Sequence, residues 1–374
     1  MWDIAYRGFL PKDNPIHQLE FEPEFQDIEY LVAQMPLLTH QGKFRDEAVS
    51  CLKLIDPDFY EENDFDLETV EKLFKHYCYI ASAYVHALNE PKVESLPAVI
   101  AVPLVHLSEL VGRPPILSYA SYCLNNWRLN DPAGLIHLDN LSLQQNFSHT
   151  NKQDEDWFIL VHVEIEYCAS LAMTMLNRFL TLDKPTEQQL DETLRAVLGS
   201  LIAMNKAMSR MPEKCGEDFY FKAVRPFIFG FENIVYEDCF NNEPQSYRGE
   251  TGAQSSIVPS FVAALGIEHK DSMLTKHLDL MRSYMPIPHR MFIEKLENKR
   301  DEGFSLRGAV IFAGKHLDLY NQCLEELLKF RTKHLEYAVN YIQKKVDNPT
   351  GTGGTPFIPW LSQLRDETDQ YFLK

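Results

Sequence analysis

Long helical stretches with few interruptions constrain the fold of this chain more than any other feature. The 374 residues include 16 glycines and 21 prolines, and the intervals between them carry apolar side chains every three or four positions. One such stretch follows Asp66, a residue suited to capping a helix. A second follows Pro185, where Thr186 and Gln189 fit a capping box. Its apolar stripe consists of Leu190, Leu194, Val197, Leu201, Met204 and Met208.

The same periodicity predicts further helices, whereas the alternating pattern of β-strands is scarce. These helical segments are 157–181, 219–232, 254–266, 273–284, 304–314 and 316–346. We therefore expect an all-α fold. The polar segment Asn146–Asp156 lacks periodicity, and we interpret it as a linker. It would divide the chain into a smaller, mostly helical N-terminal domain (1–150) and a larger helical C-terminal domain (151–374).

Charge and composition exclude several classes of protein. The net charge of −18 is the opposite of the basic balance that nucleic-acid binding requires, so we expect no nucleic-acid partner. No apolar run approaches the roughly 20 residues that span a bilayer, and the N-terminus lacks a signal-peptide pattern. We therefore expect a soluble, cytoplasmic chain without a membrane partner. The seven cysteines form no CxxC pair, which argues against a disulfide framework and a zinc–thiolate site.

His334 lies beside the apolar face of the predicted helix 316–346, one turn after Arg331. A histidine in this position is either a packed core residue or an axial ligand, because a neutral imidazole on a rigid helix can bind a haem iron. In the second case Arg331 would pair with a haem propionate. Periodicity alone leaves both interpretations open.

Two further residues stand out against apolar surroundings. His162 follows Phe158 by one turn in a strongly apolar run, so it is a packed histidine, a distal-site residue or, with Glu166, half of a metal site. Arg225 lies among aromatic residues and would pair with an internal carboxylate, stack on a ring or clamp an anionic ligand. The glycine-rich segment Gly351–Thr355 matches no nucleotide-binding loop and suits a flexible lid.

Several segments, in the same order along the chain, resemble the indoleamine 2,3-dioxygenase family. The most specific is Met281–Arg290, close to the family pattern M-R-x-Y-M-P-x-x-H-R. Arg331–His334 resembles the R-x-x-H that contains the family's proximal histidine. The other similar segments are Arg113–Tyr119, Tyr220–Gly230, Gln254–Ser256, Leu265–Ile267 and Gly351–Thr355.

The resemblance implies a helical haem enzyme that cleaves the indole C2–C3 bond of L-tryptophan or a related indole with O2, giving an N-formylkynurenine-type product. His334 would hold the iron of haem b, Thr251 and Gly252 would lie along the haem, and the N-terminal domain would cover the distal pocket. Arg225 would bind the substrate carboxylate. Thr352 would contact the amino-acid portion of the substrate. The walls of the indole pocket would be Phe158, Tyr119 and Tyr220.

The chain departs from the family pattern at several positions. His162 falls where the animal enzymes have a serine and the related tryptophan 2,3-dioxygenases have a histidine that bonds the indole N–H. This makes His162 a candidate catalytic residue. Val262 falls where the animal enzymes have an aspartate beside the arginine, so Arg331 needs another partner, such as a propionate. Tyr122 and Cys123 replace smaller pocket residues.

Two alternative functions would also involve bound haem. One is an oxygenase or rearrangement enzyme of indole secondary metabolism. The other is a haem-binding protein without turnover, although an arginine clamp together with Thr352 favours an amino-acid substrate. The oligomeric state follows from none of these patterns, and a monomer or weak oligomer is our expectation.

Overall fold

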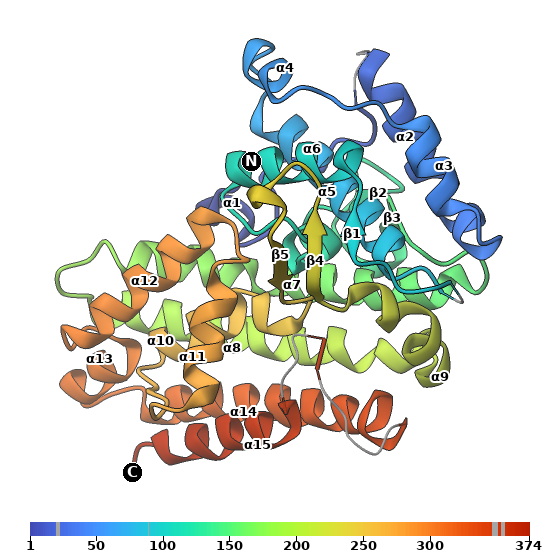
Figure 1. Cartoon of the computed structure of the whole chain (residues 1–374). Coiled ribbons are helices and arrows are strands. Elements are labelled where there is room, and N and C mark those ends of the chain that lie inside the picture. The colour runs from blue at the N-terminus through green and yellow to red at the C-terminus, as the bar shows by residue number, and fades with distance from the viewer. Residues whose placement is uncertain (20–22, 89, 346–350, 353–355) are drawn as a thin grey trace.

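The computed structural model describes residues 1–374 apart from 20–22, 89, 346–350 and 353–355. Its N-terminal part is built from helices of different lengths around the buried helix α5 (Figure 1). The elements of this part are α1 (Ile4–Arg7), α2 (Pro23–His40), α3 (Phe44–Cys51), α4 (Pro57–Glu62), α5 (Leu67–Val85), β1 (Ser95–Leu96), α6 (Ala98–Val111), β2 (Trp127–Leu129) and β3 (Leu141–Leu143).

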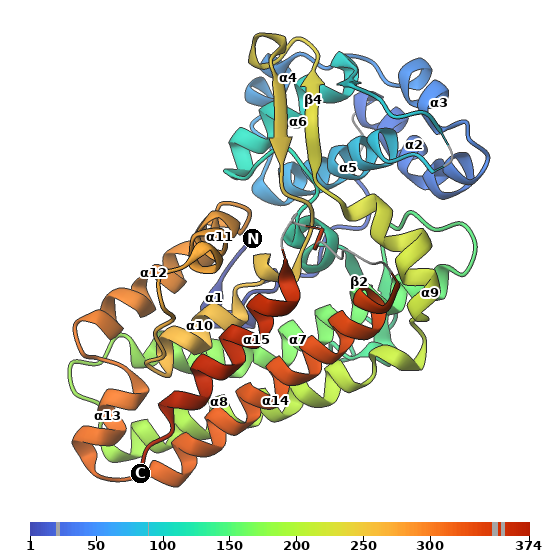
Figure 2. The same ribbon diagram turned by 60° about the horizontal axis from the view of Figure 1, so that its bottom comes forward.

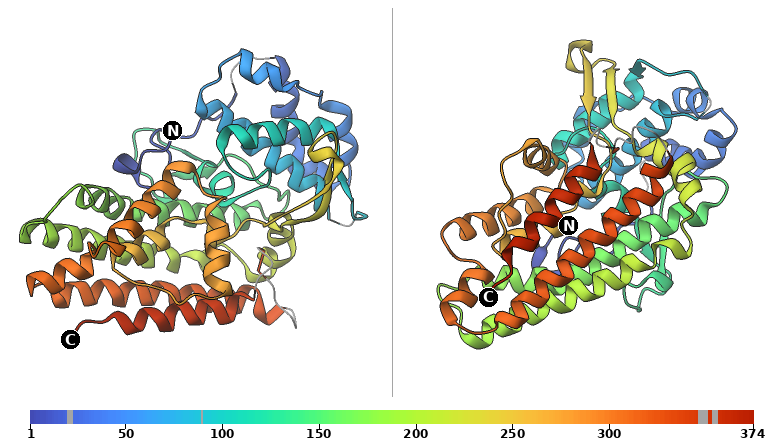
Figure 3. Two further views of the ribbon diagram at one scale, coloured as in Figure 1. Left: turned by 60° about the vertical axis from the view of Figure 1, so that its left-hand side comes forward. Right: turned by 90° about the horizontal axis from the view of Figure 1, so that it is seen from below.

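The C-terminal part is dominated by four long helices that lie side by side (Figure 2): α7 (Lys152–Phe179), α8 (Glu187–Ser209), α14 (Leu317–Tyr341) and α15 (Phe357–Thr368). Seen from below, α14 and α15 lie side by side at the front (Figure 3, right). The remaining elements are α9 (Glu217–Phe219), β4 (Phe231–Tyr236), β5 (Pro244–Tyr247), α10 (Ile257–Ala264), α11 (Met273–Arg282), α12 (Ile287–Asp301) and α13 (Leu306–Ala313).

Helices account for most of the described residues, so the expected all-α class is confirmed. Two small sheets are added to it: β2 pairs with β3, and β4 lies between β1 and β5. The parallel β1–β4 pair joins Ser95 to Val235 across much of the chain. The hairpin β4–β5 thus packs against the N-terminal helices, although it lies within the expected C-terminal domain (Figure 2).

Both predicted helix starts are present. The Asp66 carboxylate accepts the N–H of Thr69 at 2.8 Å, and Thr186 and Gln189 form the reciprocal capping box. Each cap satisfies backbone donors that a helix start would otherwise leave without partners, so these ends follow from local chemistry alone.

The segment expected to be a linker is packed into the protein at both ends, although residues 149–153 between them are exposed. Phe147 is buried and stacks on Phe227, with ring centroids 4.7 Å apart. The buried Glu155 carboxylate accepts the N–H groups of Phe147 and Ser148 at 2.9 and 2.8 Å. Because α7 already begins at Lys152, the interpretation as a polar linker was wrong. The division into two domains at this point remains a prediction.

The predicted helix over 219–232 is helical only as far as Ile228, and it is not one regular α-helix. The chain forms α9, a π-helical turn (Tyr220–Val224) and a 3₁₀ turn (Arg225–Ile228), and then enters β4. Pro226 lacks the N–H that a continuing α-helix requires, and β4 finds its hydrogen bonds in the sheet. This local unwinding determines where Tyr220 and Arg225 lie.

Among the described residues, α7 is the one helix long and apolar enough to cross a membrane by length and composition. Of its most apolar window, 61% is buried inside the protein, where it packs on α8. A core helix of this kind meets the same criteria, so the finding is weak evidence for a membrane span.

Candidate active site

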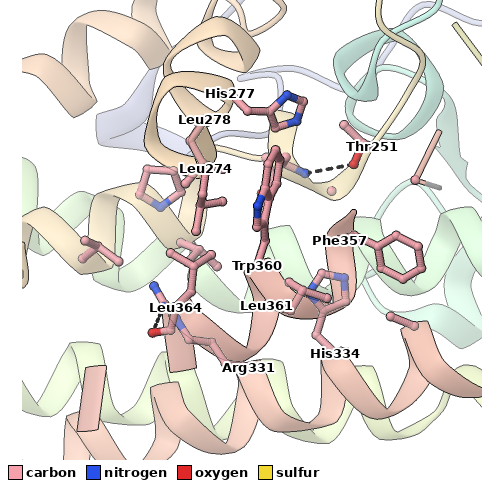
Figure 4. Close-up of a pocket in the computed structure, with 18 of the residues that line it drawn as sticks. Thr251, Leu274, His277, Leu278, Arg331, His334, Phe357, Trp360, Leu361 and Leu364 are labelled. Carbon is pink, nitrogen blue, oxygen red and sulfur yellow. Dashed lines mark hydrogen bonds between the residues drawn. The ribbon is translucent and has the colours of Figure 1, made fainter. Parts of the chain in front are cut away.

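A cavity of about 610 Å³ opens between α7 on one side and α14 and α15 on the other. Figure 4 shows Arg331 and His334 on α14, and Phe357, Trp360, Leu361 and Leu364 on α15, at the cavity. The cavity brings together eight residues that were predicted from the sequence: Phe158, His162, Tyr220, Thr251, Gly252, Arg331, His334 and Thr352. Two others, Tyr119 and Arg225, do not line it.

His334 has the properties of an iron ligand. Its imidazole makes no hydrogen bond with any described residue. His334 lines the cavity, and desolvation, with smaller effects from His162 and Arg331, lowers its pKa to about 4. The ring is therefore neutral at pH 7, the state in which histidine binds metals.

His162 lies on α7 and acts on His334 electrostatically across the cavity. Its Nδ1 lies 2.7 Å from the carbonyl oxygen of Phe158. Because a carbonyl only accepts, Nδ1 carries the proton, and Nε2 is left as an acceptor. Desolvation lowers the pKa of His162, so the neutral form persists at pH 7. The ring can thus accept one hydrogen bond from a ligand.

Tyr119 lies behind His162 rather than in the cavity wall. Its ring packs edge-on against the imidazole at 5.9 Å, and its hydroxyl donates to the Glu166 carboxylate at 3.0 Å. Ser255 donates to the same carboxylate oxygen at 2.8 Å. Burial raises the pKa of Glu166 to about 7. Glu166 therefore belongs to a network that fixes the His162 wall, an arrangement that differs from a His162–Glu166 metal pair.

Aromatic rings continue the wall beside His162, where the Phe158 and His162 ring centroids lie 4.7 Å apart. Phe158 and Tyr220 lie 4.7 Å apart at the ring centroids. Arg225 follows one turn later, is buried, and places its guanidinium 4.5 Å from the centre of the Phe229 ring. Of the alternatives for Arg225, the structure contains the stacked one, with the charge held close to Tyr220.

The segment Thr251–Gly252 and the residue Thr352 meet at the mouth of the cavity. Thr251 Oγ1 accepts the N–H of Ala253, and a side chain on Gly252 would meet nothing within 4 Å, so this position is open to a large ligand. The Thr352 hydroxyl donates to the carbonyl oxygen of Glu250. The rest of the predicted glycine-rich lid, residues 353–355, lies outside the described residues.

Arg331 has protein partners that were not predicted. One terminal nitrogen donates to the Leu364 carbonyl, and the other lies 3.2 Å from Nε2 of His269. His269 in turn contacts Glu367 at 2.7 Å. Since Val262 has no charge to offer, these residues supply the pairing that a cofactor carboxylate was expected to provide. No local pattern links positions 269, 331 and 367, so sequence reasoning had no signal for this chain of contacts.

Glu250 was also missed. Its side chain is 4% exposed and lines the cavity, directly before the predicted residue Thr251. Burial raises its pKa to about 8. A lone glutamate after a polar loop gives no periodic or motif signal, which is why it was overlooked.

The family model described as "Indoleamine 2,3-dioxygenase" matches residues 2–349. The chain belongs to this family. It is 30% identical to indoleamine 2,3-dioxygenase 1 of Rattus norvegicus, an alignment that covers 96% of this chain and 92% of the relative. It is 27% identical to indoleamine 2,3-dioxygenase of Saccharomyces cerevisiae, with 97% and 91% covered. A third relative, the 6-hydroxytryptophan 2,3-dioxygenase of Fusarium equiseti, is 26% identical, with 96% and 94% covered.

Membership in the indoleamine 2,3-dioxygenase family confirms the resemblance, the fold class and the assignment as a dioxygenase. The family depends on haem, and the cavity fits that group. His334 offers an imidazole without a hydrogen bond, and Gly252 leaves open space beside it. Val258, Val262 and Leu364 make the adjoining walls apolar.

Proposed function

We propose that this protein is a haem-dependent dioxygenase that cleaves the C2–C3 bond of L-tryptophan or a closely related indole. The observation that carries the proposal is the pair His334 and His162, which face one cavity from α14 and α7. His334 would hold haem b, which would supply the activation of O2, and both oxygen atoms would enter the product, an N-formylkynurenine. The protein supplies binding and orientation.

His162 and the aromatic wall would hold the indole ring. The unprotonated Nε2 of His162 is suited to accept the indole N–H. Phe158 and Tyr220 provide flat apolar surfaces on which an indole packs. Tyr119 would act from behind, because its hydroxyl is already bound to Glu166 and its ring supports His162.

The amino-acid portion would be bound at the other end of the cavity. Arg225, buried beside Tyr220, would bind the substrate carboxylate. Thr352 would contact the same portion from the mouth. Thr251 and Gly252 would lie along the haem, and Arg331 would hold α14 against α15 through Leu364.

The names of relatives point to more than one substrate. One relative is named for 6-hydroxytryptophan, and another is the indoleamine 2,3-dioxygenase of Aspergillus nanangensis. A ring-substituted indole of secondary metabolism is therefore the second candidate substrate. A haem protein without turnover would not need a buried arginine beside the aromatic wall to bind a substrate carboxylate. The presence of Arg225 therefore favours an enzyme over a haem-binding protein without activity.

We further propose that the protein works in the cytoplasm as a monomer or weak oligomer, without nucleic-acid or membrane partners. The excess of acidic residues supports the absence of nucleic acid. Burial of most of the apolar window of α7 supports a helix of the protein interior.

Product formation tests the proposed function directly. Haem-loaded protein is reduced and supplied with L-tryptophan and ¹⁸O₂, and the products are identified by mass. We expect N-formylkynurenine with two labelled oxygen atoms. If the loaded protein yields no such product from L-tryptophan or from hydroxytryptophans, the assignment is wrong.

A further inference from the structure

Glu250 is a buried carboxyl that has no partner in the cavity. With 4% of its surface exposed, it forms no hydrogen bond or ion pair through its side chain with any described residue. Other buried carboxyls do have partners. Glu155 accepts two backbone N–H groups, Glu166 accepts two hydroxyls, and Glu71 pairs with Arg113. A buried acid left without partners is costly, which makes Glu250 a candidate for binding a ligand.

The backbone holds Glu250 beside the elements that would bind the amino-acid portion of a substrate. Its N–H donates to the carbonyl oxygen of Ile228 at 3.0 Å, at the end of the 3₁₀ turn that begins with Arg225. Its carbonyl oxygen accepts the Thr352 hydroxyl. The neighbouring Gly249 makes this close approach possible, because a Cβ there would collide with the Ile228 carbonyl.

The charged groups of Arg225 and Glu250 share no common ion pair, and each acts on Tyr220 separately. Arg225 and Glu250 act on Tyr220 with opposite sign, the first lowering and the second raising its pKa. The two side chains, both described, form no ion pair with each other. An acid that lines the cavity and a cation buried beside Tyr220 therefore stand at separate places, an arrangement that matches a ligand with both a carboxylate and an ammonium group.

We propose that Glu250 binds the α-ammonium group of the amino-acid substrate while Arg225 binds its carboxylate. This inference rests on the proposed function and names the part of the site that selects amino acids over indoles without an amino group. The carboxyl gives up its proton as the ammonium group arrives, so that a neutral acid and R–NH₃⁺ become an ion pair and one proton passes to the buffer. The ion pair supplies the partner that Glu250 lacks in the empty cavity.

The other titratable groups around this carboxyl stay neutral. Those that interact with it electrostatically are Tyr79, Tyr119, Tyr122, Cys123 and Tyr220. Burial raises the pKa of each of them above its usual value, and desolvation keeps the His162 imidazole in its neutral form. The proton released on binding is therefore assigned to Glu250, whose own pKa is raised to about 8.

The test compares Glu250→Gln with the wild type, both loaded with haem. Turnover is measured with L-tryptophan and with indole-3-propionate, which keeps the ring and the carboxylate but has no amino group. Calorimetric titrations with L-tryptophan in buffers of different ionisation heat count the protons released. The control is Glu232→Gln, which removes an exposed carboxylate from β4, outside the cavity.

We expect Glu250→Gln to raise KM for L-tryptophan at least ten-fold with little change in kcat, and to leave KM for indole-3-propionate unchanged. Wild-type protein and Glu232→Gln should each release between half a proton and one proton per L-tryptophan bound at pH 7, and Glu250→Gln none. Equal losses for both ligands, or an unchanged proton count, would overturn the role of Glu250 while leaving the dioxygenase assignment intact. If wild-type protein cleaves no indole but releases the proton on binding L-tryptophan, only the proposed reaction fails.

Discussion

Arg331 lies on α14, three residues before the proposed iron ligand His334, and its Nη2 is 3.2 Å from Nε2 of His269. Arginine can only donate, so Nε2 accepts and the Nδ1–H of His269 donates to Glu367 at 2.7 Å. Desolvation, and then the nearby Arg331 charge, lower the pKa of His269 to about 4. A neutral histidine thus links a buried cation to a carboxylate and ties α14 to α15.

Removing this link should destabilise the protein. In His269→Leu the Arg331 guanidinium keeps its burial but loses an acceptor, at a cost of about 2–4 kcal/mol in the free energy of unfolding. Urea unfolding at pH 7 measures the difference. His277→Leu is the matched control, since His277 also lines the cavity but packs on Trp360 rather than bridging charges. Equal stabilities of the two variants would contradict the bridging role.

Because the pKa of Glu250 is raised, the free energy of unfolding should depend on pH through this group. Folding holds this group neutral up to about pH 8, whereas in the unfolded chain it ionises near 4.5, so its contribution is fully present below 4.5 and is lost as the pH rises towards 8. Without substrate, Glu250→Gln should therefore exceed the wild type in stability by about 2–4 kcal/mol at pH 8 and by little at pH 5. Thermal unfolding at the two pH values measures this. A difference independent of pH would show that the carboxyl is already ionised in the folded protein.

His334 and His162 should differ in their effect on haem binding. His334→Ala removes the proposed ligand, so haem-loaded protein should lose the Soret band of histidine ligation, and added imidazole should restore it. His162→Ala should keep the band, because Nδ1 of His162 is bound to its own helix and its role is toward the substrate. Absorbance spectra of both variants at equal haem load decide the matter. An unchanged band in His334→Ala would remove it as the ligand.

His162 should instead determine the response to the indole nitrogen. Since Nε2 is the free acceptor, the wild type should prefer L-tryptophan to its 1-methyl derivative, and His162→Ala should lose about ten-fold in kcat/KM for L-tryptophan, roughly one hydrogen bond. The ratio of kcat/KM for the two substrates is the measurement. If that ratio is the same in the variant and the wild type, His162 does not contact the indole N–H.

Local chemistry made part of this structure predictable. The caps at Asp66 and Thr186 depend on residues three positions away, and both helix starts could be expected from the sequence. The β1–β4 pairing and the His269–Arg331 contact join residues 62 to 140 positions apart, and no local pattern encodes such contacts. The linker prediction around Phe147 failed for the same reason, because the burial of this residue depends on its contact with Phe227 and not on its polar neighbours in the sequence.

The burial of Arg225 should strengthen its interaction with a substrate carboxylate. Its guanidinium lies over Phe229 in a site that excludes most water, so a substrate carboxylate would meet an almost desolvated cation, and such pairs are strong. Arg225→Leu should raise KM for L-tryptophan at least ten-fold and leave the affinity for indole, which has no carboxylate, unchanged. Steady-state kinetics and binding titrations measure the two effects. Lys222→Leu removes an exposed charge from the adjoining turn and serves as the control. A KM for L-tryptophan equal to that of the control would exclude Arg225 from substrate binding, and weaker binding of indole as well would indicate that the substitution disturbs the aromatic wall instead.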